Sequence, residues 1–113
     1  MAERKIVSEN NDPNDRAADE QALFSGFSRL NNPTEVEQFL RDLATPAELA
    51  AFAERWRIAR MLDRGDHSYR EIAASTGAST TTIGRVARFL REERYQGYRL
   101  VLDRMNADGG DRS

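Results

Sequence analysis

A helical pattern, a glycine turn and a second helical pattern follow one another over residues 68–90, and this feature constrains the fold most. Ser68 and Glu71 have the spacing of a capping box, which predicts the start of a short helix. Gly77 can adopt the left-handed backbone conformation of a tight turn, and Ser79 can cap the helix that follows. The segment is therefore predicted to form a helix-turn-helix.

The apolar spacing of this segment divides its second helix into an inward and an outward face. The side chains expected to form the core between the two helices are Ile72, Ala73, Ile83, Val86, Ala87 and Leu90. The outward face is expected to carry Thr80, Thr81, Gly84, Arg85 and Arg88. A helix N-terminus with hydroxyl groups and nearby arginines suits phosphates and base edges in a DNA major groove. The alternative is a helical hairpin that contacts no DNA.

Gly84 is unusual because a glycine in a helix interior costs about 1 kcal/mol relative to alanine. Two explanations fit its position on the outward face. Either a DNA backbone or base approaches closely there, or a neighbouring helix packs against it.

Helical spacing of apolar residues recurs through the rest of the chain, whereas the alternation typical of strands is absent. Amphipathic helices are expected around residues 23–30 and 32–43, the second with a proline in its first turn. A capping box at its start predicts a third helix over residues 45–65, and a last one is expected over 95–105. The predicted fold is all-α with six helices.

The third predicted helix has apolar residues on two different sides. Leu49, Phe52, Ala53 and Trp56 share one side, and Ile58, Met61 and Leu62 lie towards the other. An intertwined homodimer would explain both sides, because the helix could leave its own core and enter that of a second copy. A bent helix in a monomer is the alternative.

Composition restricts the chemistry that this chain can perform. It has no cysteine and a single histidine, His67, which we interpret as a surface residue at the joint before the helix-turn-helix. A cysteine nucleophile, a glycine-rich phosphate loop and a histidine-rich metal site are all absent from the sequence, so we expect neither an enzyme nor a bound cofactor or metal. The longest apolar runs are far too short for a membrane span, which favours a cytoplasmic protein.

The polar ends frame one domain. Residues 1–18 and 106–113 are predicted to be disordered, and residues 19–105 to form the helical domain. The formal net charge is −2, but residues 1–20 contain three basic and six acidic side chains. Residues 67–104 contain seven basic and four acidic ones, so positive charge collects around the predicted helix-turn-helix.

Three motifs resemble the Trp repressor superfamily in order and spacing, and within it the YerC/YecD type. They are the helix start Thr45 to Glu48, the joint Arg64 to Glu71, and the turn and recognition helix Gly77 to Arg85. The resemblance covers roughly residues 20–105. It implies an intertwined all-helical homodimer of bacterial origin, with two recognition helices about one DNA turn apart on a palindromic operator.

The resemblance also assigns residues to the DNA. Arg70 matches an arginine that contacts bases, and the first turn of the recognition helix is the part that enters the groove. With the outward face described above, the expected DNA-binding residues are Ser68, Tyr69, Arg70, Ser79, Thr80, Thr81, Thr82, Gly84, Arg85 and Arg88.

Arg55 and Arg85 match the two arginines that hold tryptophan in the Trp repressor itself. This chain departs from that pattern, because Val86 stands where the indole lies against a glycine and Phe89 stands where a serine binds the amino group. We expect that free tryptophan does not bind, and that the arginines contact phosphates or nearby carboxylates instead. No motif in the sequence predicts another small effector.

The sequence thus predicts a dimeric, sequence-specific DNA-binding transcription regulator, specifically a repressor, that acts on double-stranded DNA. A helical protein-interaction module with a vestigial helix-turn-helix is the alternative function.

Overall fold

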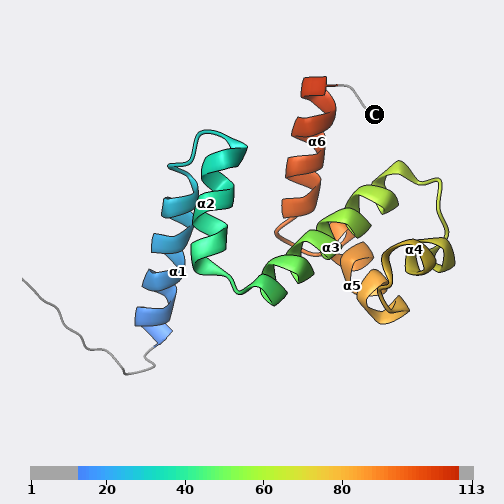
Figure 1. Cartoon of the computed structure of the whole chain (residues 1–113), viewed down its shortest axis with the longest axis horizontal. Coiled ribbons are helices and arrows are strands. Elements are labelled where there is room, and N and C mark those ends of the chain that lie inside the picture. Colours follow the sequence, from blue (N-terminus) through green and yellow to red (C-terminus); the bar gives the residue numbers. More distant parts are fainter. Residues whose placement is uncertain (1–12, 110–113) are drawn as a thin grey trace, which may run out of the picture. The chain divides into compact units, whose positions relative to one another are not determined.

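The computed structural model describes residues 13–109, which form six helices and no strand. Figure 1 shows their order along the chain. The all-α prediction with six helices is therefore confirmed. The chain divides into two compact units, with the boundary between Ala44 and Thr45.

The first unit is a hairpin of two helices, α1 (Pro13–Phe27) and α2 (Pro33–Leu43) (Figure 1). The Asn32 side chain caps α2, and it accepts a hydrogen bond from the backbone N–H of Glu35 at 3.0 Å.

The two helices of this hairpin meet through aromatic rings. Phe27 and Phe39 pack edge to face with ring centroids 5.0 Å apart. No side chain in the described part of this unit is fully buried, and Phe24 and Leu43 are about half exposed. The hairpin therefore lacks a core of its own in a single chain.

The helices extend further towards both ends of the chain than the sequence predicts. Helix α1 begins at Pro13, so residues 13–18 are helical although they were assigned to the disordered arm. Proline is well placed in the first turn of a helix, and Asp15 complements the positive end of the helix dipole. Likewise α6 continues to Gly109, beyond the expected end at residue 105. Residues 1–12 and 110–113 lie outside the described part.

The second unit contains α3 (Pro46–Arg64), α4 (Tyr69–Thr76), α5 (Thr80–Arg91) and α6 (Gly97–Gly109). Helix α3 packs against the other three, and α5 also packs against both α4 and α6. The unit is thus built around the contact between α3 and α5.

Local capping interactions set the boundaries of these helices where the sequence predicted them. Thr45 with Glu48 and Ser68 with Glu71 form complete capping boxes at the starts of α3 and α4. Two glycines in the left-handed conformation end the same helices, Gly65 at φ 77° and Gly77 at φ 80°.

The core of the second unit consists of aliphatic side chains from all four of its helices. Its buried residues are Ile58, Ala59, Met61, Leu62, Ile72, Ala78, Ile83, Val86, Ala87, Leu90 and Leu102. Ile58, Ile72 and Ile83 are completely inaccessible to solvent. The predicted inward face of α5 is confirmed, because all four of its apolar residues are buried.

The two sides of α3 have different surroundings, as the sequence indicated. The buried residues of this helix all lie in its second half, from Ile58 onwards. Towards its start, Phe52 is 43% exposed. Between these regions Trp56 stacks on Tyr98 of α6, with ring centroids 6.3 Å apart. An ion pair between Asp63 and Arg99, at 2.9 Å, also joins α3 to α6, and this contact raises the pKa of Arg99.

The last helix starts later than predicted. It begins at Gly97, after Gln96 adopts a positive φ of 55°, so Tyr95 lies in the preceding loop. Tyr95 is 84% exposed and takes no part in the core, whereas Tyr98 packs against it. The expected helix start was wrong because aromatic spacing alone does not reveal a loop of this kind.

The two glycines at Gly77 and Gly84 should respond to alanine in opposite ways. Gly77→Ala places a side chain in the left-handed conformation and should lower the free energy of unfolding by about 1–2 kcal/mol. Gly84→Ala is the matched control, because outside the local helix backbone no atom of residues 13–109 lies within 4 Å of the added Cβ and α5 has ordinary helical geometry there. It should raise stability by up to about 1 kcal/mol. Urea unfolding followed by circular dichroism measures both, and equal effects would contradict this assignment.

Candidate nucleic-acid interface

The solvent-facing side of α5 presents small polar side chains first and arginines later. Thr80 and Thr81 are exposed in the first turn, and Arg85 and Arg88 are exposed further along. Gly84 lies between them and is half-buried. A Cβ at this position would meet open space, so packing against a neighbouring part of this chain does not explain the glycine.

Two of the predicted site residues, Ser68 and Ser79, serve as helix caps, and a third, Thr82, is hydrogen-bonded to Ser79. Ser79 Oγ accepts a hydrogen bond from the Thr82 backbone N–H and donates one to Thr82 Oγ1, both at 3.1 Å. Ser68 Oγ accepts from the Glu71 backbone N–H at 3.1 Å. These hydroxyl groups fix the first turns of α5 and α4, which leaves Thr80 and Thr81 as the less constrained hydroxyls of the set.

The first turn of α4 adds two exposed side chains, Tyr69 and Arg70. No carboxylate of residues 13–109 lies within ion-pair distance of Arg70 or Arg85. Arg88 differs, because its Nε lies 3.1 Å from Glu93 Oε2 just beyond α5. The positive charges of Arg70 and Arg85 are thus available to an anionic partner.

A phenylalanine that the sequence analysis did not include among the site residues contacts both arginines of α5. The guanidinium carbon of Arg85 lies 4.4 Å from the centroid of the Phe89 ring, and that of Arg88 lies 5.3 Å from it. These are cation–π distances. The spacing of four residues between Arg85 and Phe89 on a helix was the available signal.

The orientation of α4 relative to its neighbours is fixed by polar contacts as well as by Ile72. Arg57 of α3 donates a hydrogen bond from Nη2 to Ser75 Oγ at 2.9 Å. In the turn, Thr76 Oγ1 donates to the Ile72 carbonyl and accepts from the Ala78 backbone N–H. The Thr76 hydroxyl therefore links the last turn of α4 to the residue after Gly77, before α5 begins.

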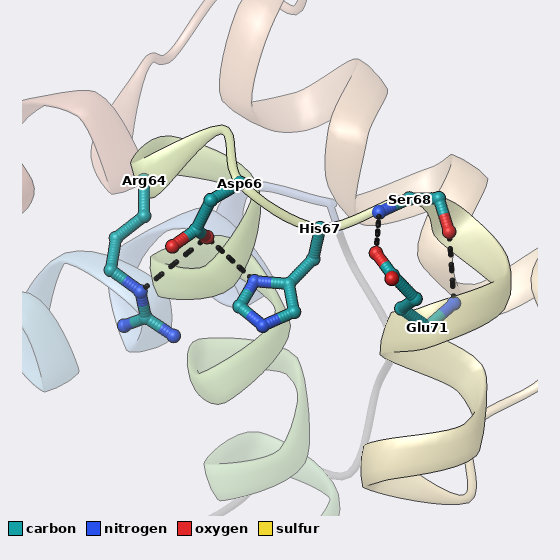
Figure 2. A network of polar contacts seen from close by, with 5 residues as sticks. All are labelled: Arg64, Asp66, His67, Ser68 and Glu71. Carbon is teal, nitrogen blue, oxygen red and sulfur yellow. Dashed lines mark hydrogen bonds and ion pairs between the residues drawn. The ribbon is translucent and has the colours of Figure 1, made fainter.

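Figure 2 shows the polar contacts of the joint between α3 and α4. His67 Nδ1 lies 2.6 Å from Asp66 Oδ1, and Arg64 Nε lies 4.0 Å from the same oxygen. The Glu71 carboxylate points instead to the backbone N–H of Ser68, at 2.7 Å. His67 is half-buried at this joint, and its neighbours suit a structural role.

The two arginines that match tryptophan ligands both lie over phenylalanine rings of this chain. Arg55 lies 5.4 Å from the Phe52 ring centroid, and Arg85 stacks on Phe89. The nearby carboxylate of Asp63 pairs with Arg99 and with neither of these arginines. Val86 is 1% exposed and belongs to the core.

Between residues 13 and 109, no group of three or more histidine, cysteine or acidic side chains could hold a metal ion. No helix in that part of the chain combines the length and apolar character of a membrane-spanning segment.

Comparison with known proteins identifies the family. The family model described as Trp repressor protein matches residues 18–106. The chain belongs to the Trp repressor family. The match spans α2 to α5 completely and most of α1 and α6, so membership applies to both compact units.

Relatives within this family include proteins from several bacteria. The chain is 40% identical over 83 residues to the uncharacterized protein YerC of Bacillus subtilis (strain 168), covering 74% of this chain and 78% of YerC. A solved TrpR-like protein from Eubacterium eligens ATCC 27750 is 36% identical with a TM-score of 0.69, covering 76% of this chain and 87% of that one. A candidate Trp repressor from Staphylococcus aureus is 37% identical with a TM-score of 0.71, covering 79% and 87%.

Proposed function

We propose that this protein is a sequence-specific DNA-binding transcription regulator, specifically a repressor. In this proposal it binds palindromic operators in the bacterial cytoplasm as a homodimer, and α4, the turn and α5 act as the helix-turn-helix. It requires no tryptophan as corepressor and performs no catalysis. Membership of the Trp repressor family supports a regulator of the DNA-binding kind.

The observation that supports this proposal most is the division of α5 into two faces. One face is buried in the core, which holds the helix rigidly, while the other presents hydroxyls, a glycine and arginines to solvent. A rigid helix with such a face is what major-groove recognition requires. The low net charge of −2 makes a protein that coats DNA without sequence preference a poorer fit.

The residues divide into two roles in this proposal. Arg70, Thr80 and Thr81 would contact base edges, since arginine pairs with guanine and threonine can hydrogen-bond to bases or contact the thymine methyl group. Arg85 and Arg88, on later turns of α5, would contact backbone phosphates. Gly84 would allow the DNA to approach the backbone of α5 closely, because no side chain between residues 13 and 109 fills the space beside it.

A homodimer would give the exposed apolar side chains a place to be buried. In the second unit Phe52 of α3 and Leu100, Val101 and Met105 of α6 are all between 43% and 52% exposed. In the described part of the first unit, residues 15–44, no side chain is buried in a single chain. Exposed apolar side chains on several helices are typical of a protein–protein interface.

Replacement of Arg70 should reduce both affinity and specificity for DNA. We expect selection from random DNA to enrich a palindromic site, and Arg70→Ala to weaken binding to it by about 5- to 150-fold, as for a direct base contact. Fluorescence anisotropy at several salt concentrations measures this effect. Arg94→Ala removes an equal charge from the exposed loop after α5 and is the control. An equal loss for both variants, or no enriched site with a folded wild type, would favour the interaction-module alternative.

Dimerisation should depend on the exposed side of α6. We expect the wild type to sediment as a dimer and Val101→Arg to shift it to the monomer, because a charge would be buried at the interface. The side chain of Val101 is 45% exposed in the single chain, so the core should tolerate this change. Asn106→Arg adds the same charge to an exposed position of α6 and should leave the dimer intact. A wild type that is monomeric at micromolar concentration would refute the dimer.

Tryptophan should have no effect on this protein. Isothermal titration with L-tryptophan should show no saturable heat, and millimolar tryptophan should leave DNA affinity unchanged. The physical reason is that Arg55 and Arg85 already lie over rings of the chain itself and that Val86 has a larger side chain than glycine. Saturable binding at micromolar concentration would show that this reasoning is wrong.

A further inference from the structure

The aromatic ring of Phe89 has a position that core packing does not explain. Phe89 is half-buried and is not a member of the buried cluster. It lies at the border between the exposed side of α5, which carries Arg88, and the buried side, which carries Leu90. The ring instead lies within cation–π distance of both arginines on the exposed face, at 4.4 Å from Arg85 and 5.3 Å from Arg88.

The two arginines depend on this ring to different degrees. Arg88 also lies 3.1 Å from Glu93, so a carboxylate holds it and neutralises part of its charge. No carboxylate of residues 13–109 lies within ion-pair distance of Arg85. In the described part of the chain, the contact with the Phe89 ring is the one that restricts the position of the Arg85 guanidinium.

Stacking and phosphate binding use different parts of a guanidinium group. The aromatic ring contacts its flat face, while the five N–H donors point outwards in the plane of the group. A stacked arginine can therefore still form two parallel hydrogen bonds to a phosphate. Arg88 differs from Arg85 in that its charge already faces a carboxylate, because Glu93 Oε2 lies 3.1 Å from Arg88 Nε.

We propose that Phe89 is a positioning residue that holds Arg85, and to a lesser extent Arg88, ready for backbone phosphates. This inference rests on the proposed DNA-binding function. A long flexible side chain loses conformational freedom when it binds, and an arginine already restricted by the ring loses less. The partner chemistry that this arrangement recognises is a phosphodiester, and the source that we propose is the backbone of the operator.

The test compares replacements of Phe89 that remove or retain an aromatic ring. Phe89→Leu keeps an apolar side chain without the ring, and Phe89→Tyr keeps the ring. Affinity for the operator enriched by the wild type should fall about two- to fivefold in Phe89→Leu, the range expected for an exposed cation–π contact, and should change little in Phe89→Tyr. Most of the loss should disappear in an Arg85→Ala background, because the arginine that the ring positions is then absent.

Several outcomes would overturn this proposal. Wild-type affinity in Phe89→Leu, or the same loss with and without Arg85, would show that the ring does not act through the arginine. A shift of Phe89→Leu to the monomer in sedimentation would assign the ring to a contact between two copies. If the wild type enriches no DNA sequence, the proposed function fails and this role fails with it. If the wild type binds its operator and Phe89→Leu binds equally well, only the role of Phe89 fails.

A second measurement does not depend on the folding of any variant. In the free wild-type protein, the side-chain protons of Arg85 near the ring should have NMR signals displaced upfield by the ring current. The displacement should persist in complex with a DNA duplex that contains the operator. Random-coil shifts for these protons in the free protein would contradict the stacking and overturn the proposal.

Discussion

The rest of the second unit depends on the packing of α5 against α3. Ile83 of α5 and Ile58 of α3 are both completely buried, and the same cluster receives Ile72 from α4 and Leu102 from α6. Because one face of α5 is fully used by this core, its axis and its rotation are both fixed. The opposite face is therefore presented to solvent in a single orientation, which is the condition for recognising a repeated shape such as a groove.

Sequence patterns predicted the parts of this structure that local chemistry determines. The capping boxes at Thr45 and Ser68, the left-handed turn at Gly77 and the inward face of α5 depend on residues within a few positions of one another. The ends of the chain were predicted less well, because low hydrophobicity indicated disorder where Pro13 begins a helix. The DNA-binding role of individual residues stays a prediction, since neither the fold nor the comparisons test it.

The contacts around Phe89 show a different limit of sequence analysis. Its ring was considered only as a replacement for a smaller side chain, whereas in the structure it lies over two arginines. A spacing of four residues permits such a contact but does not require it, because each arginine has many rotamers and several possible partners. The choice among them depends on where carboxylates such as Glu93 lie in three dimensions.

Helix α4 is the shortest helix in the described part of the chain. Of its eight residues, one side chain, that of Ile72, is fully buried, and left-handed glycines at Gly65 and Gly77 precede and follow it. Its capping box is formed within the segment itself, at Ser68. A segment with these properties can open and close as a small cooperative unit while α3, α5 and α6 remain packed. Its backbone amides should therefore exchange with solvent faster than those at the centre of α5, and the readout of a DNA site can be adjusted in α4 without loss of the core.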